Sequence, residues 1–194
     1  MNYLSLDLEL NNSQDNSIIN PKIIQVGISV GNDKDIFLTQ SWFIDPNEAI
    51  FPFITELTGI SDYTISCNAV SVNTLAEELS KIISDFNCFV NPITWGAGDA
   101  VALINLFKEN NIYFPHFGRR ELDVKQIYIF LMAAKDRNFK GSLSSAMGRF
   151  KVQFKGKAHR ADVDAENTLR FYFELLKRQK ILENFLDLGK SVQY

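Results

Sequence analysis

Apolar and polar residues follow two periodicities along the chain, one typical of strands and one typical of helices. In the segment Leu6-Asp7-Leu8-Glu9-Leu10 they alternate, so a strand here presents leucines on one face and two carboxylates on the other. Runs of β-branched and aromatic residues follow at 23–30 and 36–44, separated by the turn sequence Gly31-Asn32-Asp33. The pattern predicts a three-stranded meander within an α/β fold.

Later segments carry apolar residues every three or four positions, as helices with one buried face do. An apolar run at 89–95 predicts a further strand, which the glycines of Gly96-Ala97-Gly98 end. Residues 10–21, which are rich in Asn and Ser, and residues 112–121 are predicted to be loops. Helices are expected at 71–86, from Asp99 onward, at 124–134, at 142–150 and at 161–176.

Length and composition indicate one globular domain. The 194 residues are enough for a substantial core, and hydrophobic and charged fractions of 46% and 22% are ordinary for such a protein. We expect no membrane association, since no stretch approaches the ~20 consecutive apolar residues of a membrane span. Residues 1–5 carry no basic region of a secretory signal, so a cytoplasmic location is expected. Cys67 and Cys88 are expected to be reduced thiols.

Charge is segregated along the chain although the net charge is only −3. Residues 1–100 hold 3 basic and 13 acidic residues, whereas residues 119–160 hold 11 basic and 3 acidic ones. A local excess of +8 in the second segment can give an acidic protein a basic surface for a phosphate backbone. The alternative is that these side chains are scattered over solvent-exposed helix faces.

The paired carboxylates Asp7 and Glu9 repel each other unless cations lie between them, although an exposed edge strand would also tolerate them. Further acids strengthen the metal interpretation. Asp99 lies at a strand-to-helix junction, where capping is an alternative role, and Asp164 lies near the start of the last helix. Oxygen ligands of this kind favour Mg²⁺ or Mn²⁺ over zinc. His159 is the candidate general base.

These motifs together resemble the DEDDh 3′-to-5′ exonucleases. Leu6-Asp7-Leu8-Glu9 is similar to the first motif of that family, Trp95-Gly96-Ala97-Gly98-Asp99 to the second, and the segment 159–168 to the third. Residues 44–46 and 53–60 resemble the segment that helps to hold the terminal nucleotide in many relatives. The resemblance implies a ribonuclease-H-like fold, a mixed central β-sheet flanked by α-helices. It further implies a single exonuclease domain at 1–178 and a C-terminal tail at 179–194.

The resemblance also implies roles for individual residues. Asp7, Glu9 and Asp164 would hold the metal ion that carries the nucleophilic water, and Asp7 with Asp99 would serve a second ion, both Mg²⁺ or Mn²⁺. His159 would be the general base, and the basic segment 119–160 would follow the upstream phosphates. The residues expected at the substrate are Leu10, Asn11, Leu57, Thr58, Gly59, Ile60 and Arg160.

One departure concerns the first motif, where many relatives have threonine after the glutamate and this chain has Leu10-Asn11-Asn12. Asn11 is the expected substitute as a polar contact. The W-G-x-x-D form of the second motif is more similar to RNA-processing members, which slightly favours RNA and leaves DNA open.

The expected activity is 3′-to-5′ hydrolysis of single-stranded RNA or DNA to nucleoside 5′-monophosphates. A catalytically silent nucleic-acid-binding module and a phosphodiesterase acting on short oligonucleotides are the alternatives. A homodimer, or recruitment by a polymerase or a processing complex, is left open.

Overall fold

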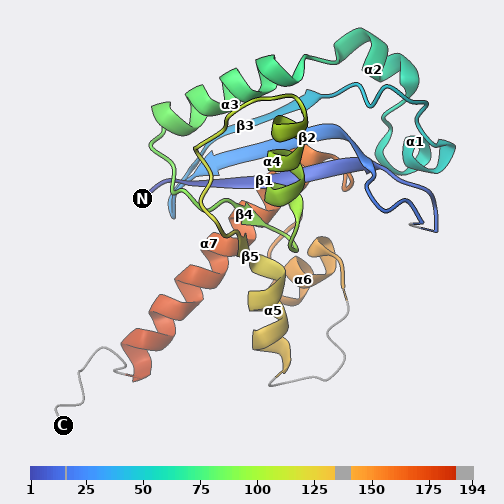
Figure 1. Ribbon diagram of the computed structural model, residues 1–194. Coiled ribbons are helices and arrows are strands. Elements are labelled where there is room, and N and C mark those ends of the chain that lie inside the picture. The colour runs from blue at the N-terminus through green and yellow to red at the C-terminus, as the bar shows by residue number, and fades with distance from the viewer. Residues whose placement is uncertain (16, 134–140, 187–194) are drawn as a thin grey trace.

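The computed structural model describes residues 1–15, 17–133 and 141–186, and its centre is a mixed sheet with the strand order β3-β2-β1-β4-β5 (Figure 1). β1, β2 and β3 form the predicted antiparallel meander, while β4 pairs parallel to β1 and β5 parallel to β4. The mixed α/β fold is therefore confirmed. The strands are β1 (Tyr3–Asn11), β2 (Lys22–Gly31), β3 (Ile36–Phe43), β4 (Ile93–Thr94) and β5 (Leu122–Asp123).

The strand predicted at 89–95 is much shorter than expected. Only Ile93–Thr94 belongs to β4, because Pro92 has no N–H to donate to a neighbouring strand. Phe89 is tied to the sheet edge separately, through its backbone N–H donating to the Asn2 carbonyl at 2.8 Å. β5 was not predicted, since two residues are too few to show a periodicity.

Helices occupy every position where the spacing predicts one, and two short helices, α1 and α2, are additional. α1 begins with Pro52 in its first turn and ends at Gly59, whose φ of +83° favours glycine. A helix this short carries too few apolar positions to show a period. The helices are α1 (Pro52–Thr58), α2 (Asp62–Asn68), α3 (Val72–Asp85), α4 (Asp99–Glu109), α5 (Val124–Ala133), α6 (Leu143–Arg149) and α7 (Ala161–Leu186).

The last helix is longer than predicted. α7 continues past residue 178, the expected domain boundary, and ends at Leu186, while residues 187–194 lie outside the described part of the chain. The division into a domain and a tail stays a prediction. Within the described ranges, no helix is both long and apolar enough to cross a bilayer.

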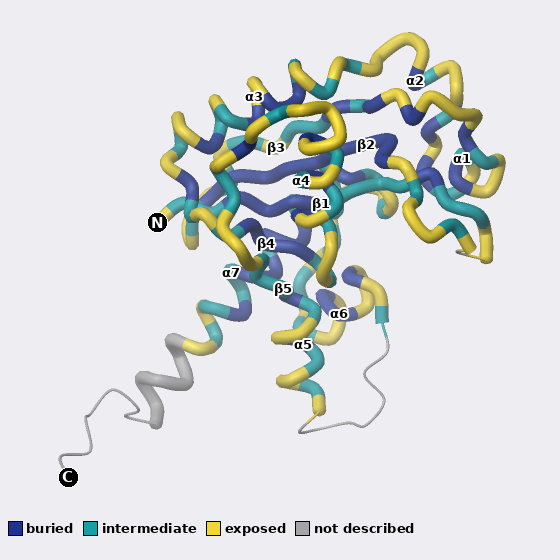
Figure 2. Tube along the Cα trace, viewed as in Figure 1, coloured by how far each residue is buried: buried dark blue, intermediate teal, exposed yellow. Residues whose placement is uncertain are grey.

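The two faces of the sheet differ in chemistry. On one face, leucines of β1 and branched residues of β2, such as Leu6 and Ile28, pack into one core with Leu79 of α3 and Phe107 of α4. α7 covers the opposite face, so the sheet is enclosed on both sides and its central strands are buried (Figure 2). Small or polar residues gather on this second face, where the register places Ser5, Asp7 and Glu9 beside Ser29, Gly27 and Gln25.

The small residues of this face allow α7 to approach the sheet closely. A Cβ placed on Gly27 would lie 2.0 Å from the carbonyl carbon of Ala161 and 2.2 Å from the backbone nitrogen of Asp162. Because Gly27 pairs directly with Asp7, this contact brings the first turn of α7 beside the first motif. Backbone packing therefore holds the third motif, at the start of α7, against the first motif on β1.

The close approach predicts that Gly27→Ala is strongly destabilising. The added methyl group collides with backbone, which cannot rotate away, so we expect the free energy of unfolding to fall by at least about 3 kcal/mol in urea titrations followed by circular dichroism. Gly148→Ala in α6 is the matched control, because a methyl group there meets no atom of the described residues within 4 Å. It should leave stability unchanged or raise it by up to about 1 kcal/mol. Equal effects of the two substitutions would contradict this packing.

Candidate active site

The first motif lies on β1, on the face covered by α7. Leu8 and Leu10 pack against the core on the opposite face, so the predicted separation of leucines from carboxylates is confirmed. Asp7 and Glu9 therefore lie between the sheet and the start of α7. The interpretation of an exposed edge strand is wrong, because β1 has β2 on one side and β4 on the other.

The second motif is a turn that joins β4 to α4. Gly96 and Gly98 have φ values of +106° and +120°, a region that side chains rarely adopt, so both positions require glycine. Gly98 takes the N-cap position and Asp99 is the first residue of the helix itself. The alternative of Asp99 as the helix cap is therefore wrong, and its carboxylate is free for another role.

Two acids that the sequence analysis missed hold this turn in place. The Glu121 carboxylate accepts hydrogen bonds from the backbone N–H groups of Gly98 and Ala100 at the start of α4. The Asp123 Oδ1 accepts one from Gly96 at 3.0 Å and another from Lys125 at 2.9 Å, at the start of α5. In the sequence, Asp123 could have been noticed because an acid just before a helix is typical of a cap. The sequence could not reveal that Glu121 and Asp123 support the glycine turn before α4, which is distant along the chain.

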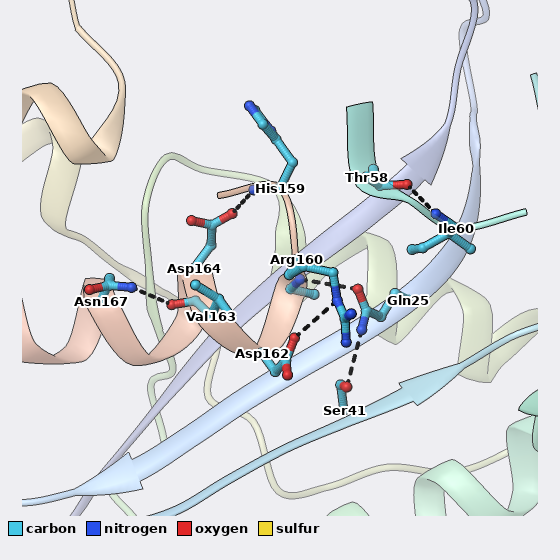
Figure 3. Close-up of polar contacts among 11 residues, drawn as sticks. Gln25, Ser41, Thr58, Ile60, His159, Arg160, Asp162, Val163, Asp164 and Asn167 are labelled. Atoms are coloured by element: carbon cyan, nitrogen blue, oxygen red, sulfur yellow. Dashed lines mark hydrogen bonds and ion pairs between the residues drawn. The ribbon is translucent and has the colours of Figure 1, made fainter. Parts of the chain in front are cut away.

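The third motif places His159 beside Asp164. His159 has a φ of +62°, a strained backbone conformation for a residue other than glycine. Its backbone N–H donates to the Asp164 Oδ2 at 2.8 Å, which fixes this conformation (Figure 3). The imidazole is exposed, and one ligand atom from each of Glu9, His159 and Asp164 lies within 4.8 Å of the other two.

The carboxylates of all three motifs are close enough to interact. Burial raises the pKa of Asp7 well above its usual range, and the charges of Asp99, Asp164 and Glu9 raise it further. The pKa of Glu9 rises to about 8, first through burial and then through Asp164 and Asp99. Arg160 acts in the opposite direction on Glu9. The structure thus brings the four predicted acids together from three distant segments.

Asp99 and Asp164 show the same effect. Burial raises the pKa of Asp99 to about 7, with added contributions from Glu121 and Asp123. Burial also raises the pKa of Asp164, although the hydrogen bond from His159 lowers it in part. Such a cluster of partly buried carboxylates fits hard divalent cations, because cations offset both the repulsion and the desolvation. Carboxylate oxygens suit Mg²⁺ or Mn²⁺ better than a thiolate-preferring ion.

The structure corrects the expectation for Asn11. Its side chain is fully buried and its amide is used within the protein, since Nδ2 donates to the Glu48 carboxylate at 2.8 Å and to the Ala49 carbonyl at 3.1 Å. Its Oδ1 accepts from the backbone of Phe51 at 2.9 Å. Asn11 therefore anchors the segment that leads into α1 and does not face a substrate.

Two further predicted substrate contacts are also wrong as side-chain contacts. Thr58 and Ile60 are only 2% and 1% exposed, and Ile60 belongs to a small core under α1 and α2. The Thr58 hydroxyl donates to the Ile54 carbonyl and accepts from the Ile60 backbone N–H (Figure 3). The turn keeps only Leu57, which is partly exposed, and Gly59, which is exposed, as candidate contacts.

Leu10 lines a cleft of about 430 Å³ that it shares with Ala102 and Leu106 of α4. Although Leu10 packs partly against the core, it is therefore also accessible from the cleft. It remains a predicted substrate contact.

Basic side chains of the segment 119–160 lie beside two turns of the predicted site and within its third motif. The Lys157 Nζ lies 3.7 Å from the position of a Cβ on Gly59, and the Lys125 Cδ lies 3.9 Å from the corresponding position on Gly96. The Arg160 Nε lies 3.5 Å from the Asp162 Oδ1. The basic segment is therefore partly gathered at the site, while Lys135, Arg137 and Lys140 lie outside the described residues.

Comparison with known proteins agrees with this geometry. The family model RNase_T, described as exonuclease, matches residues 4–172, and the chain belongs to this exonuclease family. The nuclease domain of 3′hExo, a DEDDh family member solved with rAMP, has a TM-score of 0.77 at 16% identity and covers 91% of this chain and 92% of its own. E. coli Exonuclease I, solved with a dT13 oligonucleotide, has a TM-score of 0.69 at 13% identity. The match covers 98% of this chain and 44% of the Exonuclease I chain. The ribonuclease-H-like fold and the resemblance to the DEDDh exonucleases are confirmed.

A relative in sequence is DNA polymerase III PolC-type from Streptococcus mutans serotype c, which is 27% identical over 181 residues. The match covers 91% of this chain but only 12% of the polymerase. The chain therefore corresponds to a small part of that protein.

The raised pKa values predict how stability depends on pH without metal. The folded protein keeps protons on Glu9 and Asp99 up to about pH 8 and 7, whereas the unfolded chain loses them near pH 4. Stability is therefore fully present at low pH and is lost as the pH rises through this window. We expect the Tm in EDTA to fall between pH 5.5 and pH 8.5. Mn²⁺ should raise the Tm most at the higher pH, because the ionised cluster binds it.

Glu9→Gln is the control for this experiment, because it removes one titrating acid and keeps the shape of the side chain. Its Tm should depend less steeply on pH than that of the wild type. A wild-type Tm that rises steadily over the same interval in EDTA would contradict the clustered geometry.

Proposed function

We propose that the protein is a divalent-metal-dependent 3′-to-5′ exonuclease that releases nucleoside 5′-monophosphates from single-stranded nucleic acid. The observation that carries this proposal is the convergence of four carboxylates from three segments, Asp7, Glu9, Asp99 and Asp164, with His159 beside the last. Membership of the exonuclease family supports the same reaction.

The residues of the chain have separate tasks in this reaction. Asp7, Glu9 and Asp164 would hold one cation, and Asp7 with Asp99 would hold a second. When bound, these cations activate water and stabilise the leaving oxygen of the phosphodiester. His159 takes the proton of the attacking water, a role suited to the imidazole of an exposed residue whose backbone is bonded to Asp164.

The surroundings of the carboxylates suit a polyanionic substrate. Arg160 is close enough to lower the pKa of Glu9, while Lys157 lies beside Gly59 and Lys125 beside Gly96, so these cations can attract phosphates that the acids would otherwise repel. Leu10 and Leu57 offer apolar surfaces for the terminal nucleotide without reading its identity. The W-G-x-x-D motif favours RNA slightly, and the relatives solved with rAMP and dT13 are compatible with either nucleic acid.

Recruitment by a polymerase or a processing complex belongs to the same proposal. Its support is the similarity to a segment of a PolC-type polymerase.

A labelled oligonucleotide tests the reaction and its metal dependence. With a 5′-labelled strand and Mn²⁺, the wild type should give a descending ladder with single-nucleotide steps, and EDTA should abolish it. Asp7→Asn should also abolish the ladder, because Asp7 serves both cations. Asp85→Asn on the exposed end of α3 is the matched control and should cleave normally. Saturable binding without cleavage under any divalent metal would contradict the activity and favour a silent binding module.

The role of His159 predicts a defect in chemistry rather than in metal binding. His159→Ala should lower kcat by roughly 10²–10⁴-fold, the range of a positioned proton-transfer group, while calorimetric Mn²⁺ affinity changes little. His116→Ala is the control, since His116 packs against the Phe114 ring, lies outside the three motifs and should be dispensable. Unchanged turnover in His159→Ala would remove this residue from the mechanism.

A further inference from the structure

A buried glutamine outside the three motifs connects them. Gln25 lies on β2 directly opposite Glu9 in the register, and its side chain is on the sheet face that α7 covers. It is 0% exposed and lies in a strand of mostly apolar residues. A polar side chain in such a position destabilises the fold unless its hydrogen bonds are made.

Both ends of the Gln25 amide are used. The Oε1 accepts from the backbone N–H of Ala161 at 3.1 Å, and the Nε2 donates to the Ser41 hydroxyl at 3.1 Å (Figure 3). Ala161 is the first residue of α7, where backbone N–H groups have no partner within the helix. Gln25 therefore ties β3, β2 and the start of α7 together at one point.

This point lies between the two functional residues of the third motif. Ala161 is two residues after His159 and three before Asp164, and the backbone N–H of His159 is itself bound to Asp164. Gly27, the neighbour of Gln25 on the same face, brings the Ala161 backbone against the strand. The hydrogen bond from Ala161 to Gln25 therefore fixes the position and orientation, relative to the sheet, of the turn that carries His159 and Asp164.

We propose that Gln25 is a positioning residue that holds the third motif in register with Glu9 and Asp7, so that it sets the affinity for divalent cations and the turnover. The inference rests on the proposed metal-dependent function. Metal sites and proton-transfer sites lose affinity or activity when a supporting hydrogen bond is removed, because ligands move by fractions of an ångström. Gln25 reaches the cations through Ala161 and Asp164 and does not itself contact them.

The matched control is Ser29 on the same strand. Ser29 is likewise 0% exposed and on the same face, and its hydroxyl bonds to the Leu38 carbonyl at 3.3 Å and the Thr39 hydroxyl at 3.2 Å. Ser29→Ala thus removes a buried polar contact between β2 and β3 and leaves the hydrogen bond from Ala161 to Gln25 in place, while its partner Thr39 keeps its own bond to Glu166 of α7 at 3.2 Å. A general effect of core polarity would appear in both variants, whereas a positioning effect appears only at Gln25.

The experiment compares Gln25→Met, Ser29→Ala and the wild type. Methionine keeps the length of the side chain and removes both hydrogen bonds. Isothermal titration calorimetry should show Mn²⁺ binding about 10-fold weaker or more in Gln25→Met and unchanged in Ser29→Ala. On an oligonucleotide, Gln25→Met should lower kcat by about 10–100-fold with KM nearly unchanged.

Wild-type Mn²⁺ affinity and wild-type kcat in folded Gln25→Met would overturn the inference, as would equal losses in the two variants. Should Gln25→Met fail to fold, Ser41→Ala replaces it. That variant frees only the Nε2 end and should weaken Mn²⁺ binding in the same direction, and an unchanged affinity would overturn the inference. A wild type that binds Mn²⁺ but cleaves nothing would refute the proposed function, while the calorimetric comparison still decides the role of Gln25.

Discussion

The crowding of four partly buried carboxylates at one point is the constraint on which the rest of this structure depends. Burial raises the pKa of each acid, and Asp99 and Asp164 raise the pKa values of Asp7 and Glu9 further, so holding the four together costs free energy. Such an arrangement requires a rigid frame, because flexible acids would separate into solvent. Each acid accordingly lies on, or at the first turn of, a regular element.

This frame is built from residues outside the proposed set of metal ligands and proton-transfer groups. Gly27 lets the backbone of α7 rest on β2, and Gln25 fixes the first residue of that helix. Glu121 and Asp123 hold the glycine turn before Asp99 through backbone N–H groups. The carboxylates of the three motifs are therefore supported by other carboxylates and by an amide that accept hydrogen bonds from the backbone.

The sequence was sufficient to predict the first strand and the three motifs, because both depend on local patterns. The strand shows as an alternation of apolar and polar residues, and the motifs show as fixed spacings between acids. The leucine face of β1 and the start of α4 at Asp99 were predicted from such patterns and are confirmed. Roles set by distant contacts could not be predicted. Asn11 is polar and close to the acids in the sequence. Its side-chain amide nevertheless forms hydrogen bonds with the segment before α1 and is therefore not part of the site.

Thr58 and Ile60 were misassigned for the same reason, since local spacing does not show that a turn folds inward onto a small core. Conversely, Glu121 lies 23 residues from the glycine it supports, and only the fold brings the two together. The acids that the fold brings together could be found by pattern, while the residues that position them could not.

The central claim is that these acids form one site for two cations. A crystal structure of the protein soaked with Mn²⁺ and a nucleoside 5′-monophosphate tests it most directly, because manganese is located by its anomalous scattering. The account predicts two peaks roughly 3.5–4 Å apart, enclosed by Asp7, Glu9, Asp99 and Asp164, with the phosphate of the nucleotide against them. Manganese bound elsewhere on the protein, with this cluster free of anomalous density, would contradict it.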